Sequence, residues 1–275
     1  EHFSKYGLKP SALATSYAMA ENVFAVTQGG IAEPVIIDRI DRKSLVERQI
    51  AKPVDEILDQ DKAINDHAGV DNPEIIYMLS AGKPIEGTRV NILDNTGAPV
   101  QERVIGEIAI KSNYMLTGYY HRPDLTEKAF IDGWYLTGDL GYQVDNHVFI
   151  TGRKKDLIIG GGKNIYPQDL EHLAAEVEGV YPGRVVAFGI YNENGGTEDV
   201  VIVAETTIDE NQVPKSPETQ NELERIATEI RQQVTRGSDI SLRYVQLVNR
   251  NWLIKTSSGK ISRAANREKY LAEFL

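Results

Sequence analysis

The spacing of hydrophobic and polar positions changes along the chain. Between residues 75 and 151, apolar and polar residues alternate in short runs that are separated by turn-forming residues. Alternation is the period of a strand with one buried face, and short strands at this spacing predict a small barrel or sandwich. The predicted strands are residues 88–94, 102–111 and 147–151, and a short helix is predicted to begin at Pro123.

From residue 153 onward the pattern is α+β. Apolar residues recur at helical spacing after Pro167 and again after Pro217, and proline suits the first position of a helix. We expect these helices to end at Gly179 and Gly237, because glycine favours helix termini. The charged C-terminal segment, residues 261–275, also has a helical pattern. The predicted strands are residues 156–159, 184–191, 200–206 and 243–248, with a hairpin turn at residues 192–196.

Two other segments are less regular. Residues 15–28 mix apolar and small residues around a lone acidic residue, Glu21. Residues 41–74 are polar and irregular, and they predict surface loops with a short helix near residues 55–63.

Length, charge and cysteine content exclude several classes of function. The length of 275 residues predicts about two domains. The net charge of -10 disfavours a general nucleic-acid or anionic-membrane binder, and no apolar run approaches the ~18–20 residues that span a bilayer. The absence of cysteine excludes disulfides, zinc-thiolate sites and a cysteine nucleophile, and the five histidines have no short metal-ligand spacing. No secretory signal is visible, so the cytoplasm is the expected compartment.

Two polar clusters are candidates for ligand binding. Asp139 follows the run Trp134-Tyr135-Leu136-Thr137-Gly138. A carboxylate held at a tight turn can accept hydrogen bonds from two hydroxyls, as in a ribose diol, but aspartate is also common in ordinary β-turns. The three cations Arg153, Lys154 and Lys155 lie where the pattern changes to α+β. They suit a phosphate group, and they equally suit a solvated linker.

Two loops are further candidates. Gly160-Gly161-Gly162 allows a ligand to pass close to the backbone, or it forms a hairpin turn. It is not part of a Walker loop, whose pattern is absent from the sequence. The flexible, hydroxyl-rich segment Thr256-Ser257-Ser258-Gly259-Lys260 offers one ammonium group, which suits a developing negative charge on phosphate or carboxylate. The alternative is a mobile surface loop.

Together these motifs resemble those of one family. The chain resembles the C-terminal half of adenylate-forming enzymes, the superfamily of acyl-CoA synthetases, non-ribosomal peptide adenylation domains and luciferases. Within it, Tyr166-Pro167-Gln168-Asp169-Leu170-Glu171 resembles the fatty acyl-AMP ligase branch, whereas the glycine run is closer to that of CoA ligases. The four motifs, in order, are Tyr17-Ala18-Met19-Ala20-Glu21, Tyr135-Leu136-Thr137-Gly138-Asp139, Gly152-Arg153-Lys154-Lys155-Asp156 and Thr256-Ser257-Ser258-Gly259-Lys260.

The resemblance implies a fold and a set of roles. Residues 1–152 would be the C-terminal part of the large adenylation domain, with a remnant of its sheet and a β-barrel subdomain at about 75–152. Residues 153–275 would be the small, mobile α+β domain. The implied roles are adenine contact for Tyr17, Mg²⁺ binding for Glu21, ribose binding for Asp139, ribose and phosphate contact for Arg153, the hinge for Lys155, and a bridge between acid and α-phosphate for Lys260. Gly161 and Gly162 would lie on the hairpin presented after domain rotation.

The implied reaction uses ATP and Mg²⁺ to activate a fatty or similar lipophilic acid as acyl-AMP. The acyl group would then pass to CoA or to the phosphopantetheine of an acyl carrier protein. Two alternatives stay open, a true acyl-CoA synthetase and a non-catalytic module that docks a carrier protein. The pyrophosphate loop of the family lies upstream of the Tyr17 motif and has no counterpart here. We therefore expect the chain to be a fragment that is inactive alone.

Overall fold

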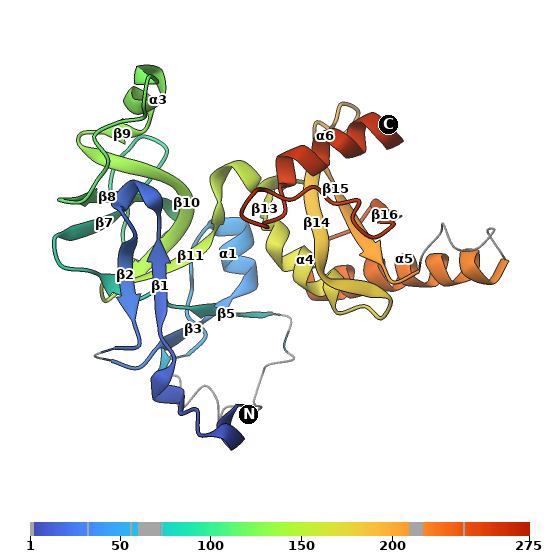
Figure 1. Cartoon of the computed structure of the whole chain (residues 1–275), viewed down its shortest axis with the longest axis horizontal. Coiled ribbons are helices and arrows are strands. Elements are labelled where there is room, and N and C mark those ends of the chain that lie inside the picture. Colours follow the sequence, from blue (N-terminus) through green and yellow to red (C-terminus); the bar gives the residue numbers. More distant parts are fainter. Residues whose placement is uncertain are drawn as a thin grey trace. The chain divides into compact units, whose positions relative to one another are not determined.

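The computed structural model describes residues 3–31, 33–55, 57–59, 72, 74–208, 217–238 and 240–275. The chain forms two compact units, residues 1–155 and 156–275 (Figure 1). No helix in the described parts of the chain is long and apolar enough to cross a lipid bilayer. The fold is a mixture of α and β structure, as the sequence predicts. The assignment of the two units to an adenylation part and a mobile domain stays a prediction.

A five-stranded antiparallel sheet dominates the first unit. It curls into a half barrel instead of closing, which corrects the expectation of a small barrel or sandwich (Figure 1). Ile108 and Ile110 of this sheet are fully buried, and the rings of Tyr142 and Phe149 stack 4.8 Å apart. The strands, in spatial order, are β11 (His147–Arg153), β10 (Trp134–Val144), β8 (Gly106–Ser112) and β7 (Thr88–Leu93), and β9 (Phe130–Ile131) also pairs with β10.

Two three-stranded sheets complete the first unit. One has the order β1 (Thr15–Ala18), β2 (Ala25–Gly29) and β6 (Lys83–Pro84), and the other has the order β4 (Leu58–Asp59), β3 (Ile36–Asp41) and β5 (Ile75–Leu79). The helices among the described residues of this unit are α1 (Arg42–Arg48), α3 (Pro123–Lys128) and the 3-10 turns η1 (Ser4–Tyr6), η2 (Pro10–Ala12) and η3 (Ala20–Asn22). The 3-10 turn η4 (Lys154–Asp156) crosses the boundary to the second unit.

Helix α1 is not predicted by the sequence, which indicates loops across residues 41–74. Its start is fixed by Asp41, whose side chain accepts a hydrogen bond from the Ser44 amide at 2.7 Å. An aspartate cap of this kind stabilises a helix N-terminus by about 1 kcal/mol. Leu45 is buried and anchors the helix on the unit. The helix predicted near residues 55–63 falls mostly outside the described residues, and β4 occupies the part that is described.

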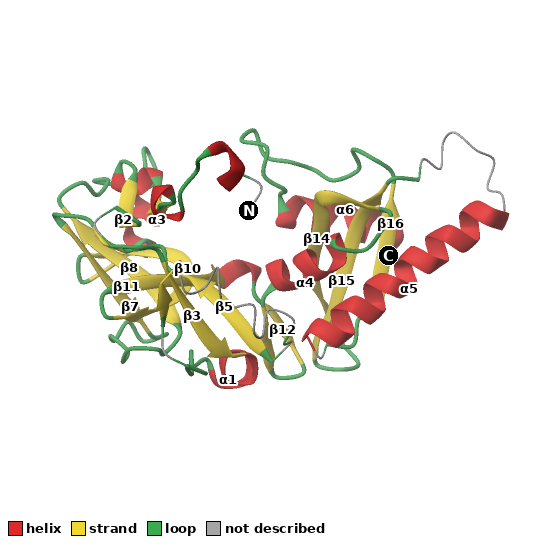
Figure 2. Ribbon diagram, turned by 90° about the horizontal axis from the view of Figure 1, so that it is seen from below, coloured by secondary structure: helices red, strands yellow, loops and turns green. Residues whose placement is uncertain are grey.

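The second unit is a three-stranded sheet with helices on both faces. Strands β14 (Val180–Asn192) and β15 (Thr197–Thr206) are antiparallel, and β16 (Tyr244–Val248) runs parallel to β15. Helices α4 (Pro167–Ala175) and α5 (Pro217–Ser238) cover one face, and α6 (Arg263–Phe274) covers the other (Figure 2). A separate hairpin joins β12 (Ile158–Gly160) to β13 (Lys163–Ile165).

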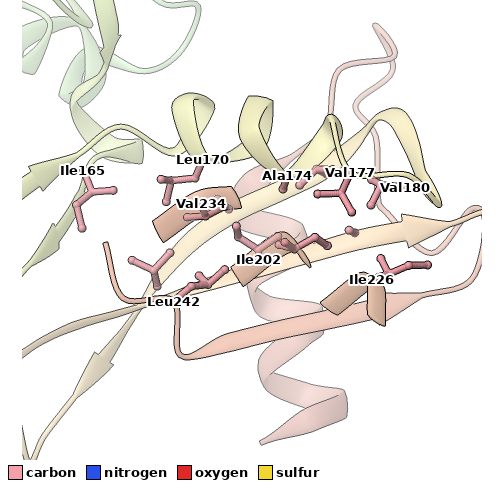
Figure 3. Packing of buried hydrophobic residues seen from close by; sticks show 14 of the residues in the cluster. Ile165, Leu170, Ala174, Val177, Val180, Ile202, Ile226, Val234 and Leu242 are labelled. Carbon is pink, nitrogen blue, oxygen red and sulfur yellow. The ribbon is translucent and has the colours of Figure 1, made fainter. Parts of the chain in front are cut away.

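Both faces of the sheet formed by β14 and β15 carry apolar side chains, so helices must pack on both of them. Ile202 points to the core beneath α4 and α5, together with Leu170 and Ile226 (Figure 3). Val201 and Val203, its neighbours in sequence, point to the opposite core beside Tyr270 of α6. A strand that is apolar at successive positions is buried on both faces, so the run of residues 200–204 requires the sandwich of helices that is observed.

Three predicted boundaries are wrong. The strand predicted at residues 102–111 begins only at Gly106, because Arg103 adopts a positive φ of 68° and the chain turns there. The strand predicted at 156–159 begins at Ile158, after η4. Helix α4 ends at Ala175 instead of continuing to Gly179, and Val177 reaches the core from the turns that follow. The other predicted helices and strands of this unit agree with the structure to within about four residues.

Candidate functional site

Three predicted site residues meet in the first unit. Asp139 on β10 lies directly opposite Arg153 on β11. The Asp139 carboxylate accepts a hydrogen bond from the Tyr17 hydroxyl on β1 at 2.5 Å and another from Arg153 Nε at 3.0 Å. Tyr17 and Asp139 are both buried, whereas 59% of the Arg153 side chain is exposed. The carboxylate is therefore held from two sides, and the guanidinium stays accessible to a ligand.

Asp139 lies within a strand and not in a turn between two elements, which corrects the expectation of a tight turn. The pairing of β10 with β8 shifts register between Leu136 and Leu140, and Gly138 has a φ of +72°. These features mark a bulge, which bends a strand and re-aims the side chains beside it. Thr137 fixes the bulge, since its hydroxyl donates to the Ile108 carbonyl at 2.7 Å and accepts from the Asp139 amide at 3.0 Å.

Glu107 supports the same bulge, and the sequence does not single it out. One of its carboxylate oxygens accepts a hydrogen bond from the Gly138 amide at 3.1 Å, and the other pairs with Lys154 Nζ at 2.8 Å. The Glu107 side chain is mostly buried, although Lys154 is half-exposed. Glu107 thus connects the segment before Asp139 to the cation cluster that follows β11. An isolated glutamate in a predicted strand carries no sequence signal for this role.

Burial and charge keep the Tyr17 hydroxyl protonated. Loss of solvent around the phenol raises its pKa far above the ordinary value near 10, and the adjacent Asp139 carboxylate raises the pKa further. The Tyr17 hydroxyl therefore donates a hydrogen bond to Asp139 at any physiological pH. The orientation of the carboxylate is built into the fold.

Glu21 lies beside a pair of tyrosines. It belongs to η3, which connects β1 and β2, and its carboxylate is 3.4 Å from the Tyr119 hydroxyl. Tyr119 in turn shares a hydrogen bond of 2.9 Å with the Tyr135 hydroxyl. The pKa of Tyr135 is raised, first by burial and then by Tyr119, with Glu21 and Tyr17 as further contributors. These tyrosines connect the surroundings of Glu21 to those of Asp139, and Tyr119 is a residue that the sequence does not indicate.

The backbone immediately after Glu21 is strained. Val23 has φ 64° and ψ -53°, and the Phe24 amide donates to the Asn22 carbonyl at 2.7 Å. This is a γ-turn with positive φ, a rare conformation for a β-branched residue. Such a residue costs on the order of 1–3 kcal/mol and persists only where its surroundings enforce it. Buried Asn22 does so, since its amide group donates to the Ala25 carbonyl at 2.7 Å and its oxygen accepts from the Ser112 hydroxyl.

The donor set around Glu21 fits Mg²⁺ only if a ligand completes it. Within the described residues, no group of three or more histidine or carboxylate side chains is arranged to hold a metal ion. Mg²⁺ is commonly held by one or two carboxylates together with water and substrate phosphates. One partly exposed carboxylate such as Glu21 is compatible with that arrangement.

Lys155 is exposed and is the last residue of the first unit. It is the middle residue of η4, between Lys154 and Asp156. Lys154 pairs with Glu107 of the first unit, and Asp156 pairs with Arg263 of the second unit at 2.6 Å. The residues on either side of Lys155 are therefore fastened within different units.

Gly161 and Gly162 form the turn of the β12–β13 hairpin. Gly160 pairs with Lys163, and the two glycines between them have φ values of +58° and +78°. Two successive positive φ values define the tight hairpin turn that favours glycine. The Gly161 amide donates to the Thr197 hydroxyl at 2.8 Å, which attaches the hairpin to the start of β15. The structure therefore supports a hairpin turn, one of the two interpretations left open by the sequence.

Lys260 lies on a hydrogen-bonded hairpin, within the segment that the sequence predicts to be a flexible loop. The Thr256 amide donates to the Lys260 carbonyl at 2.7 Å, and the Gly259 amide donates to the Thr256 carbonyl at 2.9 Å. Lys255 and Ile261 form an antiparallel bridge, and the Lys260 amide donates to the Thr256 hydroxyl at 3.2 Å. The Lys260 residue itself is exposed. The predicted site residues are thus divided between the two units: Tyr17, Glu21, Asp139, Arg153 and Lys155 in the first, and Gly161, Gly162 and Lys260 in the second.

Comparisons with known proteins identify the family. No family model matches the chain. The chain is 31% identical to the long-chain-fatty-acid–AMP ligase of Mycolicibacterium smegmatis over 98% of its length, and 30% identical to the medium-chain-fatty-acid–acyl-carrier-protein ligase of Moorena producens, also over 98%. It covers 45% and 43% of these relatives, so it spans less than half of their length.

Solved structures agree with this relationship. A structure from a study of fatty acyl-adenylate ligases from E. coli and L. pneumophila superimposes with a TM-score of 0.79 at 25% identity, over 99% of this chain and 44% of that chain. The chain belongs to the adenylate-forming superfamily. Within that superfamily it is similar to fatty acyl-AMP ligases and acyl-CoA synthetases.

Proposed function

We propose that the whole protein carrying this chain is an ATP-dependent ligase that activates a fatty or similar lipophilic carboxylic acid as its acyl-adenylate. In this reaction a carboxylate oxygen of the acid attacks the α-phosphorus of ATP, and the bond to the β-phosphate breaks to release pyrophosphate. A thiol then attacks the acyl carbon, and AMP leaves. The cytoplasm, where ATP is available, is the proposed compartment.

The observation that carries this proposal is the oriented Asp139 carboxylate beside Arg153. Each carboxylate oxygen has two lone pairs, so Asp139 can accept ribose hydroxyls while it keeps its hydrogen bonds to Tyr17 and Arg153. A buried acceptor next to an exposed guanidinium suits a ligand that combines a diol with a phosphate. A nucleotide has this combination of groups.

The other predicted residues supply charge. Glu21 would hold Mg²⁺ together with the phosphates, and the metal would supply positive charge to the phosphate oxygens when bound. Lys260 would bring its ammonium to the acid and the α-phosphate. Phosphoryl-type transfer depends mainly on positioning and on the stabilisation of negative charge. The hydrogen-bonded hairpin that carries Lys260 supports such a positioning role.

Transfer of the acyl group to the thiol would use a different surface of the second unit. Lys155 is the proposed hinge for the rotation that presents this surface. A hinge is a residue at the end of an element that absorbs a large change in φ and ψ. The exposed position of Lys155 at the boundary of the two units supports this assignment.

The acceptor is proposed to be the phosphopantetheine thiol of a carrier protein, following the Moorena producens relative. Free CoA is the second candidate, since the glycine run at the β12–β13 turn is closer to that of CoA ligases. An added Cβ at Gly161 or Gly162 would meet no atom within 4 Å, so a ligand can approach this backbone closely. Thioester formation with free CoA, compared with formation on a holo carrier protein, separates the two candidates.

The test of the proposed function is pyrophosphate release from ATP with a panel of fatty acids. We expect release by the whole protein that depends on the acid. Asp139→Asn should raise the KM for ATP, and Lys260→Ala should lower kcat. Asp145→Asn, an exposed aspartate at the β10–β11 turn, is the matched control and should change neither. Acid-independent release, or full activity of Asp139→Asn, would contradict the proposal. Release by the 275-residue chain alone would overturn the expectation that it is inactive.

A further inference from the structure

Two buried polar side chains fasten the base of the hairpin that carries Lys260. Asn266 on α6 is fully buried. Its side-chain oxygen accepts a hydrogen bond from the Ile254 amide at 2.8 Å, and its amide group donates to the Ile254 carbonyl at 2.9 Å and to the Ser262 carbonyl at 2.8 Å. Asn266 thus connects both arms of the hairpin to one helix.

The backbone of Leu253, the residue before Ile254, is also held by a buried side chain. Fully buried Glu205, near the end of β15, accepts a hydrogen bond from the Leu253 amide at 2.9 Å. The arm that enters the hairpin is therefore fixed at two consecutive amides, by side chains from β15 and α6. The Ser262 amide closes the base with a bond of 3.0 Å to the Ile254 carbonyl.

We propose that Asn266 is a positioning residue for Lys260, acting through the hairpin base. The inference rests on the proposed function for the role of Lys260, but its geometry stands on its own. The Asn266 carboxamide presents a donor and an acceptor to Ile254, as a neighbouring strand would, so residues 254–262 behave as a paired element. Removing the side chain takes three hydrogen bonds from the two arms and leaves the Ile254 amide without its acceptor.

A reaction-specific readout distinguishes positioning from a general structural role. In the proposed function Lys260 serves adenylation, whereas transfer of the acyl group to a thiol uses another surface of the unit. In the whole protein, Asn266→Ala should therefore slow adenylation by about 10²-fold, the cost expected for a displacement of ~1 Å. Transfer from a synthetic acyl-adenylate to the thiol should stay within about twofold of the wild type, because Lys260 does not serve this step.

Matched variants complete the test. Asn192→Ala removes three hydrogen bonds from a different hairpin of the same unit, the β14–β15 turn, and should leave adenylation unchanged. Asn266→Ser keeps one donor for the Ser262 carbonyl, so it provides a folded variant of intermediate effect if Asn266→Ala unfolds. In a double variant with Lys260→Ala, the loss of Asn266 should cause no further loss of adenylation, because both changes remove the same contribution.

A second measurement tests whether Asn266 holds the hairpin base closed, without reference to activity. We call the Asn266 contacts to Ile254 and Ser262 the clamp. Trypsin cleaves after Lys255 and Lys260, and in the isolated chain the closed hairpin should protect both sites. In Asn266→Ala, cleavage at these sites should become about tenfold faster, relative to cleavage after Lys163, because proteolysis follows the population of the opened hairpin.

The outcomes separate the two proposals. Unchanged tryptic cleavage, or equal loss of both half-reactions in folded Asn266 variants, would overturn the positioning role alone. Full adenylation by Lys260→Ala would overturn the proposed role of Lys260, and with it the catalytic consequence of the clamp. Faster cleavage combined with a selective loss of adenylation would support the proposal.

Discussion

The hydrogen bond between Tyr17 and Asp139 yields a quantitative prediction. Tyr17→Phe removes only the hydroxyl, so the ring still fills its place beneath the sheet and no cavity forms. What is lost is one bond of 2.5 Å to a carboxylate, between two buried side chains. Hydrogen bonds to charged groups contribute about 1.5–3 kcal/mol to stability. Asp139 keeps its bond to Arg153, so we expect the free energy of unfolding of the first unit to fall by about 2 kcal/mol.

The two tryptophans allow this unit to be measured separately. Trp134 lies in the first unit and Trp252 in the second. In a Trp252→Phe background, urea unfolding followed by tryptophan fluorescence reports on the first unit alone. Tyr120→Phe, which changes a highly exposed tyrosine, is the matched control and should shift stability by less than about 0.5 kcal/mol.

A double-mutant cycle identifies the partner of the hydroxyl. If Tyr17 acts through Asp139, the loss caused by Tyr17→Phe should largely disappear in an Asp139→Asn background. An effect of Tyr17→Phe no larger than that of Tyr120→Phe would refute the reasoning. An undiminished effect in the Asp139→Asn background would do so as well.

Three further predictions follow from the structure. Burial raises the pKa values of Tyr17, Tyr135 and Tyr142 above the ordinary value near 10, so the stability that these phenols contribute is complete below pH 10 and is lost as the pH rises above it. Phenolate absorbance and unfolding, followed together in an alkaline titration, should therefore coincide for these three residues. Gly162→Val should destabilise the second unit by about 1–2 kcal/mol in urea, because φ at this turn is +78° although the space is open. Arg263→Leu should cost that unit about 3 kcal/mol in the same assay, since it removes the guanidinium that pairs with two mostly buried carboxylates at 2.6 and 2.7 Å.

Hydrophobic periodicity predicts the second unit well because its elements are long and strongly patterned. Ile226, Ile230 and Val234 recur at helical spacing, and all three are fully buried along α5. Periodicity is less informative in the first unit, where the strands are short and turns interrupt them. Helix α1 has seven residues, too few for a visible repeat, and its start depends on one cap at Asp41.

The candidate site shows a similar division. Motif order in the sequence identifies Tyr17, Asp139 and Arg153, and β1, β10 and β11 bring them together. Glu107, which holds the bulge before Asp139, and Tyr119, which lies beside Glu21, come from segments without motifs. The role of Glu107 depends on a strand register and on a bulge, and neither is visible in a single sequence.

Residues 154–156 provide the structural support for Lys155 as the proposed hinge. Lys154 is fixed to Glu107, which also holds the bulge before Asp139. Asp156 is fixed to Arg263, only three residues after Lys260 on the same hairpin-to-helix segment. In the proposed hinge, a change in φ and ψ at Lys155 would leave both ion pairs in place. The same contacts would connect any change at Lys155 to the Asp139 bulge on one side and to the Lys260 hairpin on the other.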